Sequence, residues 1–289
     1  MTLRRSLLLL VLLPACQATN TGATSTPAPW TDRIIAPITS PVTFESPTIQ
    51  TNARPIFAHH SFPSDSIFGG GALDVYALQL RYAVNDRFAI IATKDGYFDL
   101  QPDTGSNESG MADVAGGFKY AFIDDPDKGL IATAGLIYEG TNGDKDVFQG
   151  NGDGTWRPFV SAGLASGDMS YVGSLGLQWP NDRDAETTSF DWHLQGAWHA
   201  PDSKFAPVLE LSGIHYISGG EALAVDFEGG DVINLGASGV GGNDLVTGAV
   251  GLRWNAWGRS WLGLAWETPV FSRDDLFDDR VTADLVVVF

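Results

Sequence analysis

Hydrophobic and polar residues alternate along most of the chain after its first fifty positions. In the stretch SFDWHLQGAW, Phe190, Trp192 and Leu194 fall on one side, while Asp191 and His193 fall on the other. A period of two is the pattern of a β-strand with one apolar and one wetter face. It recurs in about twelve segments of roughly ten residues, as strands do. The predicted strands cover 52–61, 72–82, 87–98, 112–122, 129–140, 155–164, 169–179, 188–199, 205–216, 245–255, 260–271 and 279–289.

The connections between these segments alternate between short and long. Turns such as VNDR (84–87) and ASGD (165–168) alternate with long stretches such as QPDTGSNESG (101–110), TNGDKDVFQGNGDGT (141–155) and residues 217–243. Outer-membrane barrels have short periplasmic turns and long external loops. The sequence therefore predicts an all-β fold, a transmembrane antiparallel up-and-down β-barrel of about twelve strands.

Aromatic residues gather at both ends of the predicted strands, as in the two interfacial belts of a membrane barrel. The belt near the short turns comprises Tyr82, Phe88, Phe122, Trp198, Phe205, Trp254, Trp257, Trp261 and Phe289. The belt near the long loops comprises Tyr138, Trp156, Trp179, Phe190 and Phe271. The chain ends on VTADLVVVF, in which Val281, Ala283, Leu285, Val287 and Phe289 share one face. We expect Phe289 to face lipid at the periplasmic interface.

The first residues have the layout of a secretory signal. Arg4 and Arg5 precede a short apolar run from Leu7 to Leu13, which is too short to span a bilayer. Two interpretations of residues 1–18 stay open. LPAC resembles a lipobox, which would make Cys16 the lipidated first residue, whereas cleavage after Ala18 would discard Cys16 with the signal.

Residues 19–51 are rich in Thr, Pro and Ser and show no sustained period, so a flexible leader is expected there. The barrel is expected to occupy 52–289 as one domain. Because Cys16 is the only cysteine, the chain can form no internal disulfide.

The chain is strongly acidic, with 35 Asp and Glu against 17 Lys and Arg and a formal net charge of -18. Nucleic-acid binding requires a basic face, so it is excluded as a function class. An exported barrel of this kind belongs in a bacterial outer membrane. The expected partners are outer-membrane lipid and lipopolysaccharide, together with the barrel-assembly machinery, which would recognise the end of the chain at Phe289.

Several stretches resemble a known family of bacterial barrels. The segments ARPIFAHHSF, RFAIIATKDGYF, GFKYAF and LFDDRVTADLVVVF are similar to the putative MetA-pathway of phenol degradation family. The resemblance implies an outer-membrane barrel that moves small molecules, aromatic or hydrophobic ones among them. It identifies no individual solute.

The inward faces of the predicted strands carry charges of both signs. The expected lumen-lining residues are Arg81, Lys94, Asp113, Lys119, Glu139, Arg157, Asp191, His193, Glu210, Arg253, Glu267 and Asp284, with Gln79 beside them. Two interpretations stay open: a packed network that neutralises itself, and the lining of an aqueous path. Residues 217–243 are expected to fold back over the outer mouth, with or without a helical turn, because a loop of this length usually has a role. The alternative, a flexible external loop, stays open.

Catalysis and metal binding find little support. An enzyme needs a nucleophile, a base and an orienting group together, and the sequence shows no exposed Ser–His pair at matching depth on adjacent strands. Asp144, Asp146 and Asp153 share a loop, but Phe148 replaces a ligand that a calcium loop would need. We expect no catalytic residues, no metal site and no cofactor.

The best-supported function from sequence is passage of small molecules through the barrel. The first alternative is a barrel that presents its loops for adhesion or membrane organisation. The second is an enzyme that modifies lipids.

Overall fold

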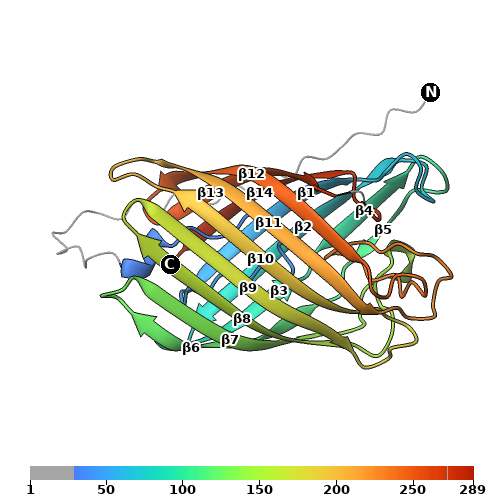
Figure 1. Ribbon diagram of the computed structural model, residues 1–289, viewed down its shortest axis with the longest axis horizontal. Coiled ribbons are helices and arrows are strands. Elements are labelled where there is room, and N and C mark those ends of the chain that lie inside the picture. The colour runs from blue at the N-terminus through green and yellow to red at the C-terminus, as the bar shows by residue number, and fades with distance from the viewer. Residues whose placement is uncertain (1–28, 272) are drawn as a thin grey trace.

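The computed structural model describes residues 29–271 and 273–289, which form a closed antiparallel β-barrel (Figure 1). Closure is complete because the first strand pairs with both the second and the last. The strands are β1 (Asn52–Ser61), β2 (Gly71–Ala83), β3 (Phe88–Lys94), β4 (Tyr97–Pro102), β5 (Glu108–Met111), β6 (Ala115–Asp125), β7 (Leu130–Glu139), β8 (Thr155–Ser166), β9 (Met169–Pro180), β10 (Thr188–Trp198), β11 (Phe205–Ser218), β12 (Asp244–Trp257), β13 (Ser260–Pro269) and β14 (Asp279–Val288). Two short 3-10 helices, η1 (Trp30–Arg33) and η2 (Lys145–Val147), accompany them. Among the described residues, no helix is long and apolar enough to cross a bilayer.

Fourteen strand segments make twelve wall strands, because two of the wall strands are interrupted. β2 pairs with β4 through its first half and with β3 through its second half, so β3 and β4 follow one line. β5 and β6 follow the next line in the same way, since β4 pairs with β5 and β3 pairs with β6. The structure confirms the predicted twelve-stranded barrel. It corrects the expectation of a long loop over 101–110, whose ends belong to β4 and β5.

Along most wall strands, exposed outward side chains alternate with buried inward ones. β8 shows this alternation without exception over all 12 of its residues. The outward side chains are largely apolar, for example Leu194, Val250 and Leu264, each more than half exposed. Such a surface is stable in hydrocarbon, and closure leaves no open sheet edge there. The barrel is therefore built for a membrane, and this architecture is typical of the bacterial outer membrane.

The two ends of the barrel differ as predicted. Short turns and the C-terminus lie at one end, and long loops gather at the other (Figure 1). Phe289 is 76% exposed next to the short turns, and its backbone N–H donates to the carbonyl oxygen of Thr51. The aromatic belts also hold, with one exception. Trp261 turns inward and packs against a buried cluster that contains Ile35 and Ile38.

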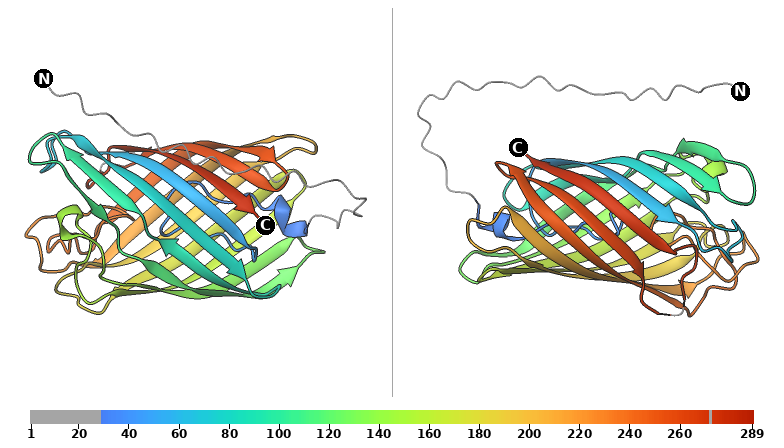
Figure 2. Two further views of the ribbon diagram at one scale, coloured as in Figure 1. Left: turned by 180° about the vertical axis from the view of Figure 1, so that it is seen from behind. Right: turned by 90° about the horizontal axis from the view of Figure 1, so that it is seen from above.

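The expectation of a flexible leader is wrong for residues 29–51. This segment, which we call the plug, enters the barrel at the end with the short turns, turns back near its middle and returns to start β1 (Figure 2). The turn is made at Ser40 and Thr43, where the Thr43 N–H donates to the Ser40 carbonyl. Residues 1–28, including the proposed signal and Cys16, lie outside the described residues.

The plug is held inside because its apolar side chains have partners in the wall. Ile34 and Phe44 pack with Ile131 and Val172 in one cluster. These apolar residues are irregularly spaced among prolines, so they follow neither a helical nor a strand period. The composition, rich in Thr, Pro and Ser, therefore did not predict that this segment packs inside the barrel.

Candidate functional site

All of the residues predicted to line the lumen face the interior of the barrel. Glu139 is half-buried, and the others are buried. They form a packed and largely paired network, which agrees with the first of the two interpretations of these charges. Much of this network holds the plug.

Glu45 of the plug lies between two cations of the wall. Its carboxylate accepts hydrogen bonds from Arg81 at 2.9 and 2.5 Å and from the Lys119 ammonium at 2.7 Å. Lys119 also donates to the Ser46 carbonyl, and the Ser161 hydroxyl donates to the Glu45 carbonyl. Because all these groups are buried, each charge depends on its partner.

A second cluster binds the plug through its carbonyl groups. Asp284 lies between Arg54 and Arg253 and accepts from both. Arg253 in turn donates to the carbonyls of Ala36 and Pro37 at 3.1 and 2.6 Å, and Arg54 donates to that of residue 38 at 2.9 Å. Pro37 has no N–H of its own, so the plug cannot build a full ladder there. The arginine side chains satisfy its carbonyls instead.

Glu210 accepts hydrogen bonds from the plug, whereas the arginines donate hydrogen bonds to it. Its two carboxylate oxygens each accept a backbone N–H at 2.8 Å, one from Ile38 and one from Thr39. The Thr39 hydroxyl donates to the same carboxylate, and Gln195 supports it from β10 at 3.0 Å. The wall therefore matches donors and acceptors to the plug backbone, residue by residue.

A third cluster joins Asp191, His193 and Ser212. Asp191 is paired with Arg157 at 2.5 and 3.2 Å, and it lies 3.1 Å from His193 Nε2. His193 Nδ1 lies 2.9 Å from the Ser212 hydroxyl, directly across the β10–β11 register. Sequence reasoning considered only exposed Ser–His pairs and so missed this buried one. The plug covers the cluster, because the Phe44 ring stacks on His193 with centroids 4.9 Å apart.

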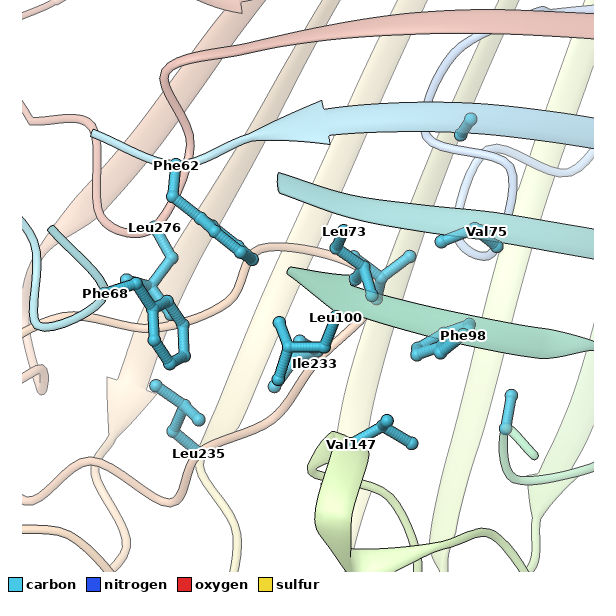
Figure 3. Close-up of a cluster of buried hydrophobic side chains, with 13 residues drawn as sticks. Phe62, Phe68, Leu73, Val75, Phe98, Leu100, Val147, Ile233, Leu235 and Leu276 are labelled. Carbon is cyan, nitrogen blue, oxygen red and sulfur yellow. The ribbon is translucent and has the colours of Figure 1, made fainter. Parts of the chain in front are cut away.

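The outer mouth is closed by the long loop between β11 and β12, as expected. Val232, Ile233 and Leu235 of this loop are buried among side chains of the wall and of neighbouring loops, including Phe62 and Leu276 (Figure 3). Residues 219–243 are all described and contain turns and two isolated bridges rather than a helical turn.

Arg280 fixes this loop to the wall. Its guanidinium donates to Asp231 of the loop at 2.6 Å and to Glu267 of β13 at 2.8 and 3.1 Å. Within the loop, Glu228 accepts the backbone N–H groups of Leu235 and Ala237. The lumen is thus occupied from both ends, by the plug below and by the loop above.

A polar cavity remains at the outer mouth between the loop and the wall. Its charged lining consists of Lys94, Asp113, Glu139, Glu186, Glu228 and Asp231. Glu186 lies in the loop before β10. Burial and the nearby Glu139 carboxylate raise the pKa of Glu186 to about 7. Among the described residues, no group of three or more His, Cys, Asp or Glu side chains is arranged to hold a metal ion.

Several residues of these clusters were not predicted, among them Arg54, Arg280, Glu45 and Asp231. Arg54 and Arg280 lie on the inward faces of β1 and β14, where the period of two could have found them. Glu45 and Asp231 belong to irregular segments, in which no periodic signal exists.

Comparison with known proteins supports the fold. No protein-family model matches the chain, and no curated relative does. Among solved structures, the chain is similar to the COG4313 outer membrane channel from Pseudomonas putida F1, with a TM-score of 0.58 and 13% identity. That likeness covers 85% of this chain and 97% of the other. The likeness shows that the chain has the fold of an outer-membrane β-barrel.

A second similar structure is the KdgM porin, with a TM-score of 0.48 and 11% identity over 82% of this chain and 99% of the porin. Identities this low bear on the fold alone. The resemblance to the MetA-pathway family is not confirmed by any family model.

Proposed function

We propose that the barrel passes small molecules across the outer membrane, and that the plug must move for them to pass. The observation that supports this is the plug itself. The lumen is wide enough to hold both arms of the plug. When the plug withdraws, the space that it occupied becomes an aqueous path. The plug is bound by side chains rather than by a strand ladder, so it can leave without opening the wall.

Deleting residues 19–50, so that the mature chain starts at β1, tests this function. The truncated barrel is expected to give larger and steadier single-channel currents in planar bilayers than the full chain. It should also let sugars and amino acids enter liposomes in a swelling assay. A correctly folded truncated barrel that carries no current would contradict the proposal and would favour a barrel that only presents its loops.

We infer the class of solute from the charges that line the lumen rather than from the resemblance to the MetA-pathway family. Membership of the MetA-pathway family would suggest aromatic or hydrophobic solutes. The charged interior and the polar outer cavity instead favour hydrophilic ones. Swelling assays with sugars, amino acids and aromatic acids separate the two.

One observation bears on an enzyme, namely the chain of contacts from Ser212 through His193 to Asp191. Asp191 is already neutralised by Arg157, and the Ser40 hydroxyl donates to Ser212 at 3.2 Å. We propose that this cluster holds the plug and performs no catalysis. A fluorophosphonate probe that labelled Ser212 in the truncated barrel would show otherwise.

The partners of the barrel are also proposals. The exposed terminal Phe289 is in the position expected for recognition by the barrel-assembly machinery. The acidic outer loops would meet lipopolysaccharide, with divalent ions between the two sets of anions. Cys16 would add a lipid anchor if the signal ends before it.

A further inference from the structure

The polar cavity at the outer mouth has an excess of negative charge. Five carboxylates line it and only one basic side chain, Lys94, does so. The cavity leaves room for about two water-sized groups, since one water needs roughly 10–15 Å³ of this kind of space. A ligand group there must be small.

Two of the five carboxylates owe their position to backbone and hydroxyl donors rather than to cations. Asp113 accepts the N–H groups of Gly143 and Gly150 at 2.7 and 2.8 Å. Glu228 accepts from Thr187 and from the loop backbone. Such bonds fix these carboxylates in place and leave their negative charge without a partner cation.

The other three carboxylates, Glu139, Asp231 and Glu186, share two cations, and one of these cations also pairs with Glu267. Lys94 donates to Glu139 at 2.5 Å, and Arg280 is shared between Asp231 and Glu267. Glu186 receives only the Thr155 hydroxyl, at 3.1 Å. Burial first, and then the nearby Glu139 carboxylate, raise the pKa of Glu186.

An independent observation comes from the second oxygen of Asp231. Asp231 is 7% exposed, and its Oδ2 has no hydrogen-bond partner among the described residues, although its Oδ1 is bound by Arg280. A buried carboxylate oxygen without a donor is costly, so this position favours a ligand that brings one.

We propose that this cavity is a binding site for the primary ammonium group of a small organic cation, at the outer entrance to the lumen. An ammonium group brings three donors and one positive charge in a volume close to that of water. The amide groups of Gln149 and Asn234 line the same cavity and can bind the polar remainder of the solute. The inference rests on the proposed channel function, since it names the solutes that the entrance selects.

Binding can be tested without conduction, on the full chain in detergent. Isothermal titration calorimetry with 1,4-diaminobutane should show one saturable site that weakens as salt is added. Succinate and 1,4-butanediol, of the same length but anionic and neutral, should not bind. Glu186→Gln should weaken diamine binding at least about tenfold, because it removes a charge at a partly buried site. Asp168→Asn, which removes one exposed charge at the opposite end, should leave it unchanged.

Three results would overturn the inference: no diamine binding to the wild type, equal binding of the diol, or equal effects of the two substitutions. Because Glu186 is not part of the clusters that hold the plug, the Glu186→Gln variant should keep its fold, and heat-shift electrophoresis of the variant beside the wild type checks this. Diamine binding without any current would contradict only the channel function. A conducting barrel that ignores the diamine would contradict only this site.

Discussion

Inside the barrel, side chains of the wall satisfy the backbone groups of the plug, which forms no strand hydrogen bonds of its own. Several carbonyl and N–H groups of the plug meet a wall side chain of the matching kind, such as Arg253 for Pro37 and Glu210 for Ile38. Inward glycines make room for these partners. A Cβ on Gly263 would collide with Asp284 and Arg253, which lie against it. The alternation of the strands could reveal which residues face inward, but it could not reveal what they bind.

Removing the charge of Glu45 should loosen the plug more than any exposed substitution. Glu45→Gln leaves Arg81 and Lys119 buried without a counter-charge, which costs about 3–5 kcal/mol for a buried pair. The expected result is a lower unfolding temperature and more frequent channel opening, measured by heat-shift electrophoresis and planar-bilayer recording. Asp125→Asn is the control, because it breaks only the exposed pair with Lys128.

The outer mouth should become less stable as the pH rises. The pKa of Glu186 is raised from 4.5 to about 7, first by burial and then by Glu139, while Lys94 and the Thr155 hydroxyl act in the opposite direction and Asp113 adds to the increase. The folded mouth therefore holds the Glu186 proton more tightly than the unfolded chain does. The contribution of this proton to stability is complete below about pH 4.5 and is lost as the pH rises through about 7.

Trypsin cleavage after Arg183 in the same loop reports this opening. The rate for the wild type, divided by that for Glu186→Gln at each pH, should increase between pH 5.5 and 8. Taking the ratio cancels the pH dependence of the protease. A ratio that stayed constant would show that Glu186 does not titrate in this window.

At the scale of elements, the strands were predictable and the segments that fill the barrel were not. β1 begins at Asn52 and β8 at Thr155, as their alternation predicted, because a wall with lipid on one side imposes a strict period. The plug faces the wall on all sides, so no period is imposed on it. The loop between β11 and β12 was anticipated from its length and apolar patches, whereas its contact through Asp231 and Arg280 depends on the tertiary fold.

If the plug moves during transport, fixing it to the wall should stop conduction. The hydroxyls of Ser40 and Ser212 lie 3.2 Å apart, so cysteines at both positions are close enough to bond. In a chain with Cys16 replaced by Ser, the oxidised double variant should carry less current than the reduced one. Reductant should restore it, and Ser40→Cys alone should not respond to oxidation. Equal currents in both states would mean that solutes pass without movement of the plug.

At the scale of the whole molecule, the wall and its filling are stabilised by different forces. The wall is held by a closed hydrogen-bond ladder and by lipid on its outer face. The interior is held by buried ion pairs, and one of them, between Arg54 and Asp284, joins residues from opposite ends of the barrel sequence. The barrel should therefore keep its shape when the plug is deleted, because the ladder does not include the plug.

The orientation of the wall towards lipid can be tested by placing one arginine at two depths. Val250 faces outward in the middle of β12, and Ile217 faces outward near the loop end of β11. Val250→Arg should cost about 2–4 kcal/mol in a bilayer and Ile217→Arg only about 0–1, because the penalty for a charge is greatest at the midplane. Urea titration of the protein in lipid vesicles, followed by tryptophan fluorescence, measures both values. Equal costs at the two positions would mean that this face does not lie in hydrocarbon, and the membrane-spanning arrangement of the barrel would then be wrong.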